Sequence, residues 1–194
     1  FIINTTLACD ANHLSFRRAA EYYNVPQYII DVPSEYSEQN LIYVSEQLKE
    51  MAEFAQKYSG LKLDNNKLAE SVERSKRTLK NFADIIPVRS ERSLSDEMTS
   101  HMFNLFATHV MLGSENAEKY SRDFLKELTA CPKGKKGIRL LWVHTLPHWQ
   151  DALRDLLNFT DRCEIIACDM TFDSMYADLD EKDPYKFMAR RLLK

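Results

Sequence analysis

The feature that most constrains the fold is a pair of short apolar stretches, one near each end of the chain, that both finish in Cys-Asp. Residues 1–6 lead to Cys9-Asp10, and residues 164–168 lead directly to Asp169. Short stretches rich in apolar and β-branched residues are typical of buried strands. The chain is therefore expected to contain two separate strand-forming regions, each ending in a thiol and a carboxylate.

The first region predicts a small parallel α/β unit. A helix is expected over residues 14–23, and a second strand is expected between Pro26 and Pro33, since prolines cannot continue a β-ladder and mark its ends. Strand, helix and strand in succession are typical of a parallel sheet, because parallel strands need a crossover connection.

A long helical stretch follows. Apolar residues recur at spacings of three and four from Ser37 onward, as they do on one face of a helix. Gly60 is a suitable C-cap, Asp64 a suitable N-cap, and Pro87 is expected to end the second helix. Four successive helices are predicted, with the limits 37–59, 64–87, 94–112 and 114–131.

A second α/β unit is expected after the glycine-containing basic linker at residues 133–137. It should contain a strand at 138–143, a helix at 149–159, a strand at 164–168 and a last helix at 184–193. The sequence thus predicts three segments: residues 1–36 as the end of one α/β domain, 37–132 as a helical region, and 133–194 as the start of another α/β domain.

Composition excludes several function classes. The formal charge is only -3, with 26 Lys and Arg interleaved among 29 acidic residues, so nucleic acid is not an expected partner. No apolar run approaches the roughly 18 residues that cross a bilayer, and the N-terminal residues lack signal-peptide features. We expect no membrane association and a cytoplasmic location.

The four cysteines form no Cys-x-x-Cys pair, which argues against a disulfide scaffold or a common zinc site. Cys9 follows a strand, where open parallel sheets place their ligand-binding loops, so its thiol could ligate a metal cluster. It could equally be a small buried apolar residue. Cys168 stands at the equivalent place in the second unit, whereas Cys131 and Cys163 are interpreted as structural.

The loop after the third strand is a candidate binding segment. It contains His144, Pro147 and Trp149, and it could line a substrate pocket or simply be a surface turn anchored by its tryptophans. Phosphate-binding glycine loops, nucleophile elbows and zinc-protease motifs do not occur in the sequence.

Several segments in a fixed order resemble the 2-hydroxyacyl-CoA dehydratase family, which includes subunits of benzoyl-CoA reductase. The 2-hydroxyglutaryl-CoA dehydratase D-component is the type that it resembles. The segments are the strand leading to Cys9-Asp10, residues 28–33, 43–48 and 67–71, residues 138–142 with Pro147 and Trp149, and Asp183-Pro184 with residues 188–190.

The resemblance implies two flavodoxin-like, or Rossmann-like, parallel α/β domains with helices between them, and a 4Fe-4S cluster held by three cysteines. Cys9 falls on one ligand position, and Cys168 is a further candidate. The other ligands of the family would fall outside residues 1–194. The chain is therefore expected to be an internal fragment that holds no intact cluster by itself.

The resemblance also implies a reaction and partners. The parent subunit would be a lyase that dehydrates, or reduces, an acyl-CoA thioester, together with a paired homologous subunit and an ATP-dependent activator protein. His144, Pro147 and Trp149 would be substrate-binding candidates. Two alternatives stay open: a cluster-carrying electron-transfer protein, and a cluster-free partner subunit with no CoA substrate of its own.

Overall fold

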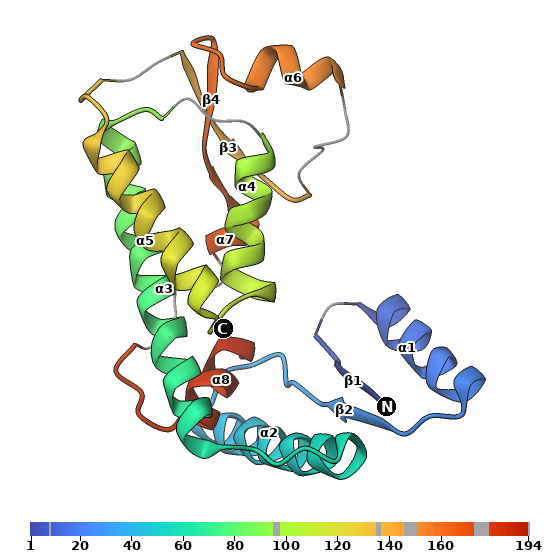
Figure 1. Ribbon diagram of the computed structural model, residues 1–194. Coiled ribbons are helices and arrows are strands. Elements are labelled where there is room, and N and C mark those ends of the chain that lie inside the picture. The colour runs from blue at the N-terminus through green and yellow to red at the C-terminus, as the bar shows by residue number, and fades with distance from the viewer. Residues whose placement is uncertain (8, 95–97, 135–136, 146–150, 173–178, 194) are drawn as a thin grey trace. The chain divides into compact units, whose positions relative to one another are not determined.

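The chain folds as a mainly helical α/β protein with short parallel strands (Figure 1). The computed structural model describes residues 1–7, 9–94, 98–134, 137–145, 151–172 and 179–193. In chain order the elements are β1 (Ile2–Thr5), α1 (Asp10–Tyr23), β2 (Gln27–Ile30), α2 (Glu38–Ser59), α3 (Asn65–Glu91), α4 (Met98–Leu105), the π-helix η1 (Phe106–Val110), α5 (Glu115–Ala130), β3 (Ile138–Trp142), α6 (Asp151–Leu157), β4 (Cys163–Cys168), α7 (Asp169–Phe172) and α8 (Pro184–Leu192).

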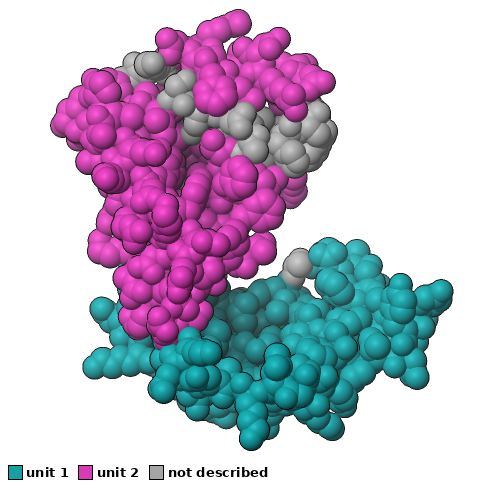
Figure 2. All heavy atoms as spheres, in the orientation of Figure 1, with its two compact units in different colours: residues 1–69, 178–194 teal, residues 70–177 magenta. Residues whose placement is uncertain are grey.

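The elements form two compact units (Figure 2). Unit 1 contains residues 1–69 and 178–194, and unit 2 contains residues 70–177. The three segments predicted from the sequence, 1–36, 37–132 and 133–194, describe changes of secondary structure along the chain, and these boundaries stay a prediction. A finding that the sequence did not reveal is that the last helix, α8, belongs to the same unit as the first strands.

Unit 1 is built on the parallel pair β1 and β2. The pair is in register from Ile2 opposite Gln27 to Thr5 opposite Ile30, and α1 connects the two strands. Pro26 precedes β2 and accepts a hydrogen bond from the amide of Ile2 at 2.9 Å, so the proline stands at the end of the ladder, where its missing N–H costs nothing.

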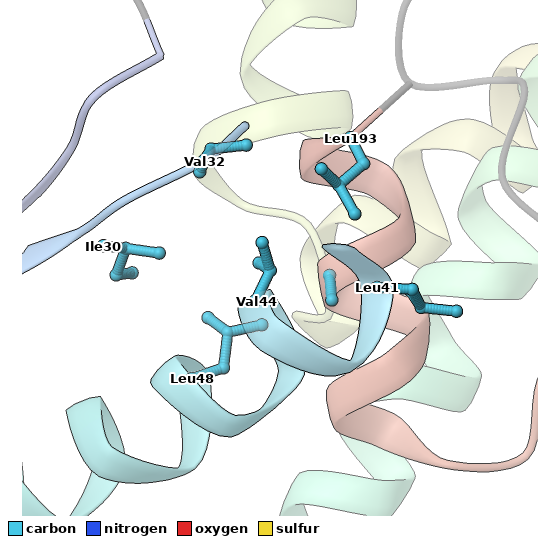
Figure 3. Close-up of a cluster of buried hydrophobic side chains, with 7 residues drawn as sticks. Ile30, Val32, Leu41, Val44, Leu48 and Leu193 are labelled. Carbon is cyan, nitrogen blue, oxygen red and sulfur yellow. The ribbon is translucent and has the colours of Figure 1, made fainter. Parts of the chain in front are cut away.

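The core of unit 1 lies where β2, α2 and α8 meet (Figure 3). Leu41 and Val44 of α2 are almost completely buried, at 1% and 0% exposure. Burying a side chain of this size stabilises the fold by about 1.5–3 kcal/mol. The full set of buried residues in this core is Ile30, Val32, Leu41, Val44, Leu48, Ala189 and Leu193. A segment near the C-terminus thus completes a core begun by the second strand.

The helices of unit 1 are capped, and the predicted C-cap at Gly60 is confirmed. The Ser37 hydroxyl accepts from the Asn40 amide at 3.0 Å at the start of α2, and Gly60 ends that helix with φ 72. A glycine suits this position because a left-handed backbone has no steric cost without a Cβ. Asp183 caps α8 by accepting from the Tyr185 amide at 2.9 Å.

Unit 2 has a helical core formed by α3, η1 and α5. Its buried apolar residues are Phe82, Ile85, Ala107, Ala117 and Leu128. The turn before α5 passes close to α3, and a Cβ on Gly113 would lie 2.4 Å from the Ser71 hydroxyl oxygen. Gly113 also has φ 88, so both the space and the backbone require glycine there.

One predicted helix limit is wrong. The second predicted helix does not end at Pro87, because α3 continues to Glu91. Proline removes only one amide hydrogen bond, and bonding resumes beyond it, with the Arg92 amide donating to the Val88 carbonyl at 3.0 Å. The third predicted helix, 94–112, is α4 from Met98 followed by η1, and residues 95–97 lie outside the described part of the chain.

The second parallel pair, β3 and β4, contacts the end of α3 through a hydrogen bond from β3. Ile138 pairs with Cys163 and Trp142 with Cys168, with one irregularity between Leu140 and Leu141. The Arg139 guanidinium on β3 donates to the Ser90 carbonyl at 3.2 Å, and a cation at the carbonyl end of a helix is favoured by the helix dipole.

The observed parallel pairs confirm the α/β class, whereas the flavodoxin-like arrangement stays a prediction. Among the described residues, no helix combines the length and apolar character needed to cross a membrane.

The buried histidine of α4 gives a test of this fold. Burial lowers the pKa of His101 to about 3; the nearby Arg89 charge acts in the same direction, and a hydrogen bond to the Ile165 backbone opposes them. An unfolded histidine titrates near 6.5, so the stability linked to neutral His101 is present above that pH and is lost as the pH falls toward 3. Between pH 7.5 and 5 the loss is about 2 kcal/mol.

We expect His101→Gln to lack this part of the pH dependence. Urea unfolding at the two pH values, followed for both proteins, measures the difference. An identical loss of stability in the two proteins would contradict the buried, neutral state of His101.

Candidate functional site

Cys9 lies in the connection that leaves the carboxyl end of β1, directly before the first turn of α1 (Figure 1). Its backbone is extended, its thiol is free, and the residue is exposed. The alternative that Cys9 is a small buried residue is therefore wrong for the described chain. An exposed thiol at the carboxyl edge of parallel strands stands where this type of sheet binds ligands.

Asp31 follows β2 at the same edge, and its backbone is held on both sides by a single amide side chain. Gln47 of α2 accepts from the Asp31 amide at 2.8 Å and donates to the Asp31 carbonyl at 2.8 Å. The Asp31 carboxylate is held as well: Oδ1 accepts from the Thr6 hydroxyl at 3.4 Å and Oδ2 from the Tyr43 hydroxyl at 3.1 Å. The carboxylate is thus fixed in direction although the residue is exposed.

Tyr43 serves this carboxylate as a proton-bearing donor. The hydrogen bond to Asp31 raises the pKa of the Tyr43 phenol above its ordinary value, and desolvation and nearby negative charge act in the same direction. The phenol therefore keeps its proton around neutral pH and points it at Asp31. Thr6, which directly follows β1, completes the arrangement, because its hydroxyl also accepts from the Val32 amide at 2.9 Å.

The carboxyl edge of β3 and β4 brings together two of the residues singled out from the sequence. The Cys168 thiol lies 3.9 Å from the His144 carbonyl oxygen and 3.8 Å from Asp169 Oδ1. Cys168 is only 1% exposed, and burial raises the pKa of its thiol. Since metals bind the thiolate, this environment makes Cys168 a poorer ligand than an exposed cysteine.

His144 itself is held in an unusual backbone conformation. Its φ is 75, in the left-handed region that non-glycine residues rarely adopt, and its amide donates to Asp169 Oδ1 at 2.8 Å. The ring Nδ1 lies 2.8 Å from the Thr145 hydroxyl, and the Trp142 indole donates to the Thr145 carbonyl at 3.0 Å. The exposed imidazole is thus carried on a turn tied to the end of β4.

The remaining predicted residues have simpler outcomes. Pro147 and Trp149 lie outside the described residues, so their substrate-binding role stays a prediction. Cys163 is buried at the start of β4, away from the carboxyl edge, and Cys131 is half-buried just after α5, with its thiol donating to the Glu127 carbonyl at 3.4 Å.

Sequence reasoning gave no role to Asp31, Tyr43 or Thr6. One signal was present, since Asp31 stands between an apolar strand and Pro33, at the place where a carboxyl-edge residue would be sought. Tyr43 gave no such signal, because its position at the edge depends on how α2 packs on β2.

The described residues do not form a complete metal site. No group of three or more His, Cys, Asp or Glu side chains in that part of the chain is arranged to hold a metal ion. The exposed Cys9 thiol suits a single soft-ligand position.

A comparison with protein families identifies the family of the chain. The family model described as 2-hydroxyglutaryl-CoA dehydratase, D-component, matches residues 1–194. No curated protein matches the chain. The family match covers both carboxyl edges described above.

The strained turn at His144 yields a prediction that needs no ligand. Replacing His144 with glycine removes the steric cost of φ 75, so His144→Gly should leave the free energy of unfolding unchanged or raise it by up to about 1 kcal/mol. The control is Val143→Gly, at an exposed neighbour without positive φ, which should lower stability by about 0.5–1 kcal/mol. Chemical denaturation of both variants measures the difference, and equal destabilisation would contradict the strained turn.

Proposed function

The chain belongs to the 2-hydroxyglutaryl-CoA dehydratase D-component family, and from this we propose that it is part of an iron–sulfur subunit that dehydrates a 2-hydroxyacyl-CoA thioester. The observation that carries the proposal is the exposed Cys9 thiol at the carboxyl edge of β1 and β2, on a chain that matches the family from end to end. The family implies a CoA thioester as substrate and a paired subunit as partner.

Cys9 would hold one iron of a 4Fe-4S cluster. A thiolate is the ligand that such clusters take, and an accessible cysteine can reach an iron without disrupting a core. The remaining ligands would come from other residues, among which Cys168 is the weaker candidate within residues 1–194. When bound, the cluster would supply the electron that activates the thioester, and the protein would contribute ligation and orientation.

The edge of β3 and β4 is proposed as a substrate-contacting region. His144 presents an exposed imidazole on a turn that Asp169 holds in place, and a strained, fixed backbone is common at binding sites. Cys168 is a weaker candidate for cluster ligation because its thiol is buried and already contacts the His144 carbonyl. Pro147 and Trp149 belong to the same proposed region by sequence.

Further parts of the proposal follow from the family alone. The two parallel units would be parts of flavodoxin-like domains, and an ATP-dependent activator protein would deliver the electron. A subunit that carried a cluster without a CoA substrate would share the Cys9 ligand but would not turn over a 2-hydroxyacyl-CoA, so an activity assay separates the two functions.

The role of Cys9 can be tested by iron analysis. We expect Cys9→Ser, in the holoenzyme purified anaerobically with its paired subunit, to lose normal cluster incorporation, because a serine oxygen is a poor ligand for iron–sulfur clusters. The matched control is Cys131→Ser, at a half-buried thiol that donates to a helix carbonyl, a contact that serine can also make.

Iron and sulfide content, with the visible absorption spectrum, are the measurements. Iron loading of Cys9→Ser at the level of the unsubstituted protein would refute the ligand assignment. Loss of iron in both variants would show that the effect is not specific to Cys9.

A further inference from the structure

The Asp31 carboxylate is more firmly held than its exposed position requires. Gln47 contacts both the amide and the carbonyl of Asp31 at 2.8 Å, while Thr6 and Tyr43 each donate to one carboxylate oxygen. A carboxylate oxygen has two lone pairs, so each oxygen can still accept one more hydrogen bond. The Asp31 carboxylate is therefore held in a fixed position and can accept further hydrogen bonds at this edge of the sheet.

A second tyrosine–carboxylate pair in the same unit provides a contrast. The Tyr28 hydroxyl donates to Glu50 Oε2 at 2.9 Å and to the Gln47 carbonyl at 3.0 Å. Burial, followed by the bond to Glu50, raises the pKa of Tyr28 to about 12. Both carboxylates accept a hydrogen bond from a tyrosine hydroxyl. They differ in their position, because Glu50 lies within α2 whereas Asp31 directly follows β2.

Asp31 and Cys9 both follow the carboxyl ends of the two paired strands. Thr6 donates to the Asp31 carboxylate at 3.4 Å and precedes Cys9 by three residues. Three residues of fully extended chain span at most about 11 Å, which limits the distance between the Thr6 and Cys9 Cα atoms. A substrate at the Cys9 edge would therefore lie at the same sheet edge as this carboxylate.

We propose that Asp31 is the proton acceptor of the dehydration, held in position by Thr6, Tyr43 and Gln47. The inference rests on the proposed function, since it needs a 2-hydroxyacyl thioester bound at the Cys9 edge. In the overall reaction the C3–H and C2–O bonds break and a C2=C3 double bond forms. Asp31 takes the C3 proton, and the hydroxyl leaves C2 as hydroxide. The proton then passes from Asp31 to this hydroxide and forms water, so the net reaction neither gains nor loses electrons.

The contacts of Asp31 suit this role. A general base must be fixed within hydrogen-bond reach of the proton that it removes, and supporting hydrogen bonds provide that fixation. Thr6 directly follows the first strand, Tyr43 and Gln47 come from α2, and all of them converge on the residue that follows the second strand. Tyr43 is a positioning residue here, because it acts through the carboxylate.

The test compares Asp31→Asn with Glu50→Gln in the holoenzyme. Each change removes the charge of one tyrosine-bonded carboxylate and keeps its size and an oxygen acceptor. The probe is 2-hydroxyglutaryl-CoA. We expect Asp31→Asn to lower kcat by about 10²–10⁴-fold, the usual contribution of general base catalysis, with the Kd for the probe, the iron content and the melting temperature unchanged. Glu50→Gln should match the unsubstituted enzyme in all four quantities.

The outcomes separate this inference from the proposed function. Full kcat in Asp31→Asn would overturn the role of Asp31 while leaving the proposed function intact. A loss of kcat accompanied by a comparable loss of iron, or by a lowered melting temperature, would also overturn it. Asp31 would then be a structural residue. If the unsubstituted holoenzyme binds iron but does not dehydrate the probe or other 2-hydroxyacyl-CoA thioesters, the proposed function fails, and the catalytic role of Asp31 fails with it.

Discussion

Parallel pairing of very short strands is the constraint on which the rest of the structure depends. Parallel strands cannot be joined by a hairpin, so β1 and β2 need α1 as a crossover, and β3 and β4 need the connection that contains α6. The same pairing brings the carboxyl ends of both strands in a pair to one edge. Cys9 and Asp31 lie next to one such edge, and His144 and Asp169 lie next to the other. In both cases the two residues are far apart in the sequence.

A pair of strands this short also needs helices to cover it. Two-stranded sheets are at best marginally stable alone, and unit 1 gains its core from α2 and α8. The packing of α2 has a further consequence at the edge, because the helix carries Tyr43 and Gln47 to Asp31. The stability of the unit and the arrangement of its edge therefore depend on the same helix.

The sequence predicted those parts of the fold that local chemistry determines. Asp64 and Ser114 act as the predicted N-caps, and Gly60 and Gly113 stand where the backbone is left-handed. The predicted helix end at Pro87 was wrong, because the loss of a single hydrogen bond does not end a helix whose buried face continues to Arg89. The packing of α8 on α2, and the contacts made by Asp31, depend on residues far apart in the chain, which no local pattern contains.

Cys9 is proposed as a metal ligand at the edge of the first strand pair. Iodoacetamide alkylation of the anaerobic holoenzyme, before and after removal of iron with a chelator, tests it most directly, with mass spectrometry measuring each cysteine. Cys9 should be protected in the iron-loaded protein and modified after iron is removed, while buried Cys163 and Cys168 stay unmodified in both states. Modification of Cys9 at the same rate with and without iron would contradict the account.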